Sequence, residues 1–385
     1  MKKKISEETY KMTNEVFKQQ MELLLDMEEK FPYVNNLENM KKSSKKKIAV
    51  VYDVDGWAYC NIAQEIKKYL SGDFDIDIFP VSVFDDNPVK LVLLADRYDL
   101  VHCLWRGLLS CLDYEYARGY IYNMGLTFEE FMDKYYSKTN ITTSVYDHKF
   151  LDEENFETTK SFAKYAKNYT VSSTILKDIY DNLDIDKKPL AVVSDGVDLE
   201  KFKPANLERF KLENISNRKI KIGWVGNSEF TDSDGDTDLK GVRKIIKPAL
   251  EELIEEGYPI ELKFADRKEG YIPHDKMPDY YNSIDVYICA SKNEGTPNPV
   301  LESMASGVPI ISTNVGIVRD ALGEKQKEFI LKERSKEDLK NKLKELLNHK
   351  EKFEELSNEN LKQIKDWTWE NKCYQFRDFF NKNLK

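Results

Sequence analysis

Hydrophobic residues in the first half of this chain gather in short runs, and amphipathic stretches separate these runs. Short apolar runs bounded by turn residues are typical of strands buried on both faces of a parallel sheet. Strands are predicted at residues 47–52, 74–79, 100–104, 141–145, 169–171 and 190–193, some as apolar runs and others as stretches that mix apolar and polar residues. Stretches with apolar positions at helical spacing alternate with them, at 57–70, 88–95, 112–136, 157–167 and up to 183. This alternation predicts a doubly wound α/β fold.

A second α/β unit is predicted after a polar stretch at 205–218, which reads as a linker. Its predicted strands lie at 220–225, 260–265, 285–290 and from 307, and its helices at 244–256 and 336–361. Ahead of the first unit, residues 5–30 have apolar positions at helical spacing, which predicts an added N-terminal helix. We therefore expect an extension at 1–46, a first domain at 47–203 and a second at 204–370.

The stretch 285–322 predicts a strand, a loop, a short helix and another strand. Asn298 is suited to cap the helix, Pro299 to its first turn and Gly307 to its end. The loop at 291–297 then opens at the carboxyl end of a strand, where open α/β sheets bind ligands. Backbone N–H groups at a helix start favour an anion there.

Length and composition narrow the class of protein. A chain of 385 residues predicts two domains, and its net charge of −9 argues against a general nucleic-acid binder. Five cysteines without metal-ligand spacing, and no signal-like or membrane-spanning run, indicate a cytoplasmic protein. Lysines at 2–4 and 41–47 are either solvated flanks or a contact with the inner face of an anionic membrane.

Two glutamates, Glu294 in the loop and Glu302 in the helix, bracket the predicted anion site. Taken alone, Glu302 also reads as a helix-start acid that the helix dipole favours. The surrounding residues, Glu-Gly-Thr-Pro-Asn-Pro at 294–299 and Gly-Val-Pro-Ile-Ile-Ser at 307–312, closely resemble the E-x7-E segment of glycosyltransferase family 4. That resemblance implies a retaining transferase with two Rossmann-like domains facing a cleft, the GT-B architecture, whose last helix, about 371–385, returns to the first domain.

Three further passages are similar to this family. Residues 193–204, with Gly-Val-Asp and Phe-Lys-Pro, resemble the passage between its domains. The turn at Gly226 and the pair Lys240-Gly241 resemble its diphosphate site, in which an Arg also binds the donor. Asn227 or Ser228 stands at the Arg position, so Arg243 and Arg267 are the candidates to replace it.

The resemblance implies a nucleotide-sugar donor, a glycan, lipid-linked or protein acceptor, and no metal or other cofactor. Catalytic roles fall to Glu294 at the transferred sugar, Lys240 at the diphosphate and His148 in the first domain. The donor-binding residues are Gly226, Asn227, Ser228, Lys240, Arg267, Tyr271, Gly295, Thr296, Pro297, Asn298, Pro299, Val300 and Glu302. The acceptor side has Gly56, Trp57, Arg106 and Tyr146 at predicted strand ends.

Other classes remain open. The missing Arg also suits a catalytically silent partner of an active transferase. An epimerase or phosphorylase would share two Rossmann-like halves, and Asp53-Val-Asp55 suits a metal-dependent transferase of single-domain type. The acidic residues 232–238 lack the Gly and Glu positions of a calcium loop and read as a solvated loop.

Overall fold

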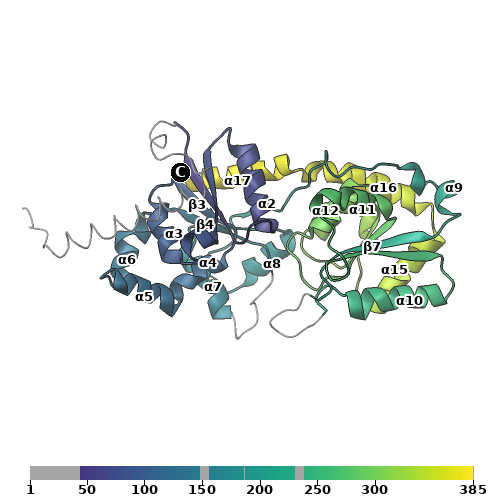
Figure 1. Ribbon diagram of the computed structural model, residues 1–385, viewed down its shortest axis with the longest axis horizontal. Coiled ribbons are helices and arrows are strands. Elements are labelled where there is room, and N and C mark those ends of the chain that lie inside the picture. Colours follow the sequence, from purple (N-terminus) through teal and green to yellow (C-terminus); the bar gives the residue numbers. More distant parts are fainter. Residues whose placement is uncertain (1–43, 148–155, 186, 230–237, 385) are drawn as a thin grey trace, which may run out of the picture.

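The computed structural model describes residues 44–147, 156–185, 187–229 and 238–384, and within them the chain forms two parallel sheets in two lobes (Figure 1). The first sheet has the order β2-β1-β3-β4-β5-β6 and the second the order β10-β9-β7-β8. The strands are β1 Lys47–Tyr52, β2 Asp75–Pro80, β3 Leu100–Cys103, β4 Ile141–Val145, β5 Tyr169–Val171, β6 Ala191–Val192, β7 Ile220–Gly226, β8 Ile260–Asp266, β9 Val286–Cys289 and β10 Ile310–Ser312.

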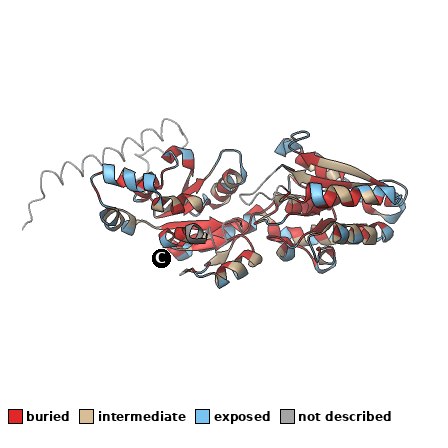
Figure 2. Ribbon diagram, turned by 90° about the horizontal axis from the view of Figure 1, so that it is seen from below, coloured by how far each residue is buried: buried red, intermediate tan, exposed pale blue. Residues whose placement is uncertain are grey.

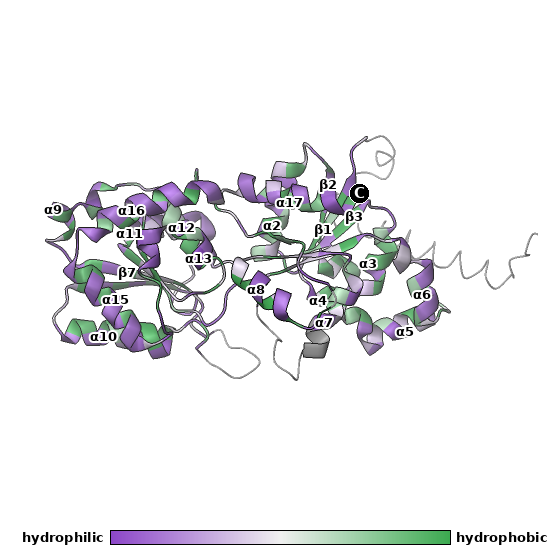
Figure 3. Ribbon diagram, turned by 180° about the vertical axis from the view of Figure 1, so that it is seen from behind, coloured by the Kyte–Doolittle hydropathy of each residue, from purple (hydrophilic) through white to green (hydrophobic). Residues whose placement is uncertain are grey.

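Helices cover both faces of each sheet (Figure 1). Their apolar sides face the strands, so most strand residues are buried, as the red strands of Figure 2 show. The outward helix surfaces are largely hydrophilic (Figure 3). The α-helices are α2 Ala58–Leu70, α3 Pro88–Ala95, α4 Gly107–Ser110, α5 Glu115–Asn123, α6 Phe128–Lys134, α7 Phe156–Tyr165, α8 Thr174–Asn182, α9 Leu212–Ile215, α10 Lys247–Glu255, α11 Met277–Ser283, α12 Asn298–Ala305, α13 Val318–Ala321, α14 Glu324–Lys327, α15 Lys336–Asn348, α16 Lys352–Gln363 and α17 Trp369–Leu384.

The strand orders determine where a ligand can enter. In the first sheet β1 lies between β2 and β3, and in the second β7 lies between β8 and β9. From β1 the chain goes to β2 on one side and then returns to β3 on the other, and β8 and β9 flank β7 in the same way. This reversal of the strand order opens a crevice at the carboxyl ends of β1 and β7. The turns that follow β1 and β7 hold Trp57 and Asn227 at these switch points, and the turn that follows β9, the neighbour of β7, holds Glu294.

The last helix, α17, packs on the first sheet and not on the second (Figure 1). Phe376, Phe379 and Phe380 are buried there among residues of β1 and α2. Just before α17, the N–H of Val197 donates to the carbonyl of Trp367 at 2.9 Å. The chain thus passes between the lobes twice, and the two connecting segments, at Val197 and at Trp367, lie side by side.

Two predictions of local structure were wrong in detail, and a third was incomplete. The stretch at 112–136 is helical as predicted, but the prediction gave no division, which the structure places between α5 and α6, where Gly125 has φ +74° and Thr127 starts α6 with a capping box. The 205–218 linker is partly folded, since Phe210 and Ile215 are buried in the second core. Asn298 begins α12 but does not cap it with its side chain.

Several predicted features lie outside the described residues, namely the N-terminal helix at 5–30, His148 and most of the acidic loop, 232–237. Asp238, the described end of that loop, is 1% exposed and accepts the N–H groups of Arg243 and Lys244. It is therefore not the solvated residue that the sequence predicts. In the described parts of the chain, none of the helices has the length and apolar character needed to cross a bilayer.

His102 on β3 gives the first lobe an expected sensitivity to acid. Its ring is fully buried, lies 3.0 Å from the hydroxyls of Thr142 and Ser144, and contacts Phe376, Phe379 and Phe380. Burial lowers its pKa to about 3, whereas an unfolded histidine titrates near pH ~6.5. Between these values the unfolded chain binds the extra proton, so stability is lost as the pH falls below about 6.5.

We expect His102→Gln to flatten the dependence of the unfolding free energy on pH between 4 and 6. Because one proton is involved, the wild-type slope should exceed that of the variant by at most about 1.4 kcal/mol per pH unit. Urea unfolding at a series of pH values measures both slopes. Identical slopes would mean that His102 is not held neutral by the fold.

Candidate active site

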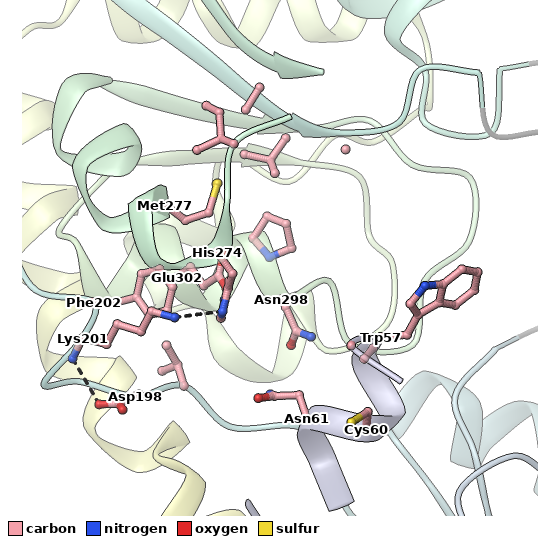
Figure 4. Close-up of a pocket in the computed structure, with 18 of the residues that line it drawn as sticks. Trp57, Cys60, Asn61, Asp198, Lys201, Phe202, His274, Met277, Asn298 and Glu302 are labelled. Carbon is pink, nitrogen blue, oxygen red and sulfur yellow. Dashed lines mark hydrogen bonds and ion pairs between the residues drawn. The ribbon is translucent and has the colours of Figure 1, made fainter. Parts of the chain in front are cut away.

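A cleft of about 810 Å³ lies between the two lobes at the carboxyl ends of the strands (Figure 4). One wall comes from the first lobe, where Trp57, Asn61 and Gln64 belong to the start of α2. The floor is the connecting segment from Gly196 to Phe202, and the opposite wall belongs to the second lobe. Predicted residues of the acceptor side and the donor side therefore line one space.

The turn after β7 forms part of the cleft wall that belongs to the second lobe. Gly226 has φ +154°, and a Cβ there would lie 2.9 Å from the Trp224 ring, so only glycine suits the turn. Gly226 and Asn227 line the cleft. Ser228 is not among the lining residues, because its N–H is held by the Asp266 carboxylate at 3.1 Å.

Lys240 and Glu294 come together although 54 residues separate them. The Lys240 ammonium donates a hydrogen bond to the Glu294 carboxylate, and the two form an ion pair. Gly241 allows this approach, since a Cβ at that position would lie 2.5 Å from the Ala290 carbonyl oxygen and its φ is +73°. A cation and a carboxylate thus form an ion pair at the turn that follows β9.

The loop after Glu294 presses against the first lobe. A Cβ at Gly295 would lie 1.8 Å from the carbonyl oxygen of Tyr146, and one at Gly316 would lie 2.0 Å from the Gly295 oxygen. Gly295 therefore fills a gap between the two lobes that no side chain fits. The Thr296 hydroxyl contacts the Asp195 N–H at 3.4 Å, which adds a second contact between the passages.

Two residues of this segment line the cleft, Asn298 and Pro299, whereas Gly295, Thr296 and Pro297 are not among the lining residues. Val300 is fully buried and packs in the core of the second lobe. Its side chain is therefore turned away from the cleft. Asn298 lies beside Asp195, and burial raises the pKa of Asp195 to about 7 while the Asn298 side chain opposes that shift.

Glu302 on α12 is held by two side chains that sequence reasoning missed. The Tyr281 hydroxyl donates to one carboxylate oxygen at 2.6 Å, and Nε2 of His274 lies 3.1 Å from the other. Nδ1 of His274 lies 2.8 Å from the Lys201 ammonium (Figure 4). Tyr281 and His274 stand in the passage before β9, but neither spacing nor pattern along the chain marks them as partners of Glu302.

Arg267 follows β8 at the same edge of the sheet as Gly226, whose carbonyl accepts the Arg267 N–H at 2.9 Å. Its guanidinium lies over the ring of Tyr271, 5.5 Å from the centroid, and both side chains line the cleft. Arg243 is exposed and is not among the lining residues. Of the two candidates for the absent Arg, Arg267 is thus the one that reaches the cleft.

The predicted acceptor side divides into two groups. Gly56 and Trp57 line the cleft, and Trp57 is 58% exposed. Arg106 is buried and pairs with Asp147 at 2.8 Å, and Tyr146 is buried against Tyr59, with 5.3 Å between the ring centroids. Neither Arg106 nor Tyr146 is a lining residue, so in this conformation both are buried in the first lobe and do not face the cleft.

Asp53 and Asp55 are engaged locally. Asp53 accepts the N–H of Val54 at 2.7 Å, and Asp55 accepts the Tyr52 hydroxyl at 2.6 Å. Within the described residues there is no group of three or more His, Cys, Asp or Glu side chains arranged to hold a metal ion.

Comparisons with known proteins agree with this geometry. Residues 268–363, which include His274, Glu294 and Glu302, match the family described as glycosyl transferases group 1. The chain has the GT-B fold, with two Rossmann-like α/β units facing a cleft. The crystal structure of Anabaena HepE in complex with UDP-glucose superposes with a TM-score of 0.58 at 12% identity, over 88% of this chain and 100% of that chain.

Curated relatives are similar over shorter stretches. Protein CapJ of Staphylococcus aureus is 27% identical over 187 residues, which are 43% of this chain and 45% of CapJ. The putative teichuronic acid biosynthesis glycosyltransferase TuaC of Bacillus subtilis is 37% identical over 57 residues, 15% of each protein. The chain therefore spans less than half the length of these curated relatives.

Proposed function

We propose that this protein is a retaining glycosyltransferase that moves a sugar from a nucleotide-sugar donor to a hydroxyl group of a glycan, lipid-linked or protein acceptor. The observation that carries the proposal is that Lys240 and Glu302 line one cleft, and that Glu294, which is not itself a lining residue, forms an ion pair with Lys240. The match of residues 268–363 to glycosyl transferases group 1 supports it. The name of TuaC, a putative teichuronic acid biosynthesis glycosyltransferase, favours a role in bacterial surface polysaccharide synthesis.

Each part of the donor has a proposed partner. Lys240, Arg267 and the N–H groups at the start of α12 take the diphosphate, because its negative charge grows as the sugar leaves. Glu302 accepts hydrogen bonds from the ribose hydroxyls, and the exposed Tyr271 ring stacks on the base. Glu294 holds the transferred sugar near its reacting carbon.

The reaction exchanges one bond at the anomeric carbon. The bond to the diphosphate oxygen breaks and its electron pair stays on that oxygen, while an acceptor oxygen bonds to the carbon and gives up its proton. Charge therefore develops on the phosphate, and preorganised cations stabilise it without reorganisation. In this proposal the cations are protein side chains, and the reaction needs no metal or other cofactor.

The acceptor enters beside Gly56 and Trp57, since the exposed indole offers a flat surface on which a sugar ring can stack. We propose a cytoplasmic site of action, which fits the free thiols of all five cysteines. Contact of the lysines near 41–47 with an anionic membrane also stays a proposal. Among the described lysines there, Lys46 pairs with Asp99 at 2.7 Å.

Calorimetry with UDP, GDP, ADP and CDP, and with their sugars, tests the donor site. We expect one base to bind, and Glu302→Ala to raise the Michaelis constant for that donor about 10- to 100-fold with little change in turnover. Ribose contacts exist both before and during reaction, and a hydrogen bond to a charged group contributes about 1.5–3 kcal/mol. Assays repeated in excess EDTA should give the same rates.

A silent partner subunit is the second candidate, because the Arg of the family's diphosphate site is absent. Arg267 at the cleft favours an active enzyme, since it supplies a positive charge on the same wall. Nucleotide binding without transfer to any acceptor in a broad panel would favour the silent partner. Absence of binding by every nucleotide would reject the active enzyme.

A further inference from the structure

Four side chains form a continuous line from the floor of the cleft into the second lobe, in the order Lys201, His274, Glu302 and Tyr281. The three contacts measure 2.8, 3.1 and 2.6 Å. Lys201 comes from the segment between the lobes, His274 from the short helix η7 (His274–Lys276), Tyr281 from α11 and Glu302 from α12. All except Tyr281 line the cleft (Figure 4).

The chemistry of the line fixes the tautomer of His274. A lysine ammonium has hydrogens to donate and no acceptor, so Nδ1 of His274 must accept. The neutral ring then has its hydrogen on Nε2, the nitrogen that faces Glu302, and donates it to the carboxylate. The Glu302 carboxylate can only accept, so it requires the same tautomer, and a hydrogen on Nδ1 would face the Lys201 ammonium. Lys201 thus reinforces the form of His274 that holds Glu302.

Glu302 is held on both oxygens by this arrangement. The Tyr281 hydroxyl bonds to one oxygen and His274 to the other, so the plane of the carboxylate cannot rotate freely. A carboxylate has about four lone-pair directions, which leaves roughly one per oxygen for a ligand. Two acceptors side by side match two neighbouring hydroxyl groups.

Neighbouring residues restrict the position of the His274 ring. Its ring lies 5.6 Å from that of Phe202, and Pro273 precedes η7. The side chain of His274 is 57% exposed and that of Glu302 is 12% exposed, so the histidine is at the surface of the cleft while the carboxylate is set back. A ligand therefore meets Glu302 in an orientation that His274 has already imposed.

We propose that His274 is a positioning residue that aims Glu302 at the two hydroxyls of a ribose, and that Lys201 keeps His274 in the donating tautomer. This inference rests on the proposed function, because it assigns the ligand of Glu302 to a nucleotide. It predicts that these side chains set the preference for ribonucleotides over 2′-deoxyribonucleotides. Loss of one hydroxyl removes one of the two hydrogen bonds that Glu302 is aimed to accept.

The experiment compares UDP, GDP, ADP and CDP with their 2′-deoxy forms by calorimetry. For the base that binds, wild type should prefer the ribonucleotide about tenfold or more. His274→Ala should reduce that preference to about twofold and leave the affinity for the 2′-deoxy form nearly unchanged. His274→Gln should restore part of it, since an amide can accept from Lys201 and donate to Glu302. Lys201→Met should give an intermediate preference.

His349→Ala is the matched control, because His349 also pairs with a glutamate, Glu351 at 3.2 Å, but lies outside the cleft. It should leave the preference at its wild-type value. A full ribose preference in His274→Ala would overturn the inference, and so would an equal loss of affinity for both nucleotide forms. A wild type that binds nucleotides without discrimination would overturn it as well. A wild type that binds no nucleotide would reject the proposed function itself.

Discussion

Glu294→Gln should lower turnover by about 100-fold or more and change the Michaelis constant for the donor much less. The proposed place of Glu294 is beside the bond that changes, and interactions that strengthen only in the transition state act on turnover. The substitution keeps the size of the side chain and removes its charge. It therefore also releases Lys240 from its ion pair, which ties the two residues together.

That ion pair predicts strong non-additivity. Lys240→Ala alone should weaken donor binding by about 1–3 kcal/mol, because it removes a charge-assisted hydrogen bond to the diphosphate. Expressed as free energies, the loss of kcat/KM in the double variant should be smaller than the sum of the losses in the two single variants by at least about 1 kcal/mol, as for residues in contact. Steady-state kinetics on the four proteins of the cycle gives the coupling energy.

Lys46→Ala with Asp99→Asn is a matched control cycle, since this pair at 2.7 Å lies on the surface of the first lobe. Its coupling in kcat/KM should be close to zero. Additive effects of Lys240→Ala and Glu294→Gln would contradict a shared role. Unchanged turnover in Glu294→Gln would remove this glutamate from the reacting centre.

Gly295→Ala should lower kcat/KM about 100-fold while the protein stays folded. The added methyl group would lie 1.8 Å from the backbone oxygen of Tyr146, which belongs to the other lobe. Separation of the lobes relieves that clash without disturbing either core, so the free energy of unfolding should change little. Displacement of the reacting groups by about 1 Å can reduce the rate by a factor of 100.

Two measurements distinguish this effect from general damage. Small-angle scattering with saturating donor should show a more open particle for Gly295→Ala than for wild type, because donor binding is expected to draw the lobes together. Gly119→Ala is the control, since a Cβ on this residue of α5 meets nothing within 4 Å. It should be as active and as compact as wild type. A fully active Gly295→Ala would show that the close contact with Tyr146 is absent from the working conformation.

Local pattern was sufficient for many elements of the fold. The predicted helix at 88–95 and the predicted strands at 141–145 and 169–171 have the same bounds as α3, β4 and β5. The helix begins after Asn87, which caps it, and the two strands are rich in β-branched or aromatic residues, so the evidence is in neighbouring residues. The prediction of two Rossmann-like units in the GT-B arrangement was confirmed.

Local pattern failed where a few residues far along the chain decide the structure. The stretch at 205–218 is polar on average, but Arg218 binds Asp285 at 2.5 and 2.7 Å, and Phe210 is buried. Asp238 lies in an acidic run, but the start of the helical segment needs acceptors for its N–H groups, and Asp238 supplies them. Average composition contains no information on such partners.

The sequence by itself determined most of the strands and the longer helices, and it put Lys240, Glu294 and Glu302 near strand ends or helix starts, where ligands bind in this class of fold. The tertiary structure alone decided which side chains touch. It paired Lys240 with Glu294, chose Arg267 over Arg243 for the cleft, and joined His274 to Glu302. The physical reason is that secondary structure follows from patterns within a few residues, whereas a hydrogen bond depends on atoms that packing brings within about 3 Å from distant parts of the chain.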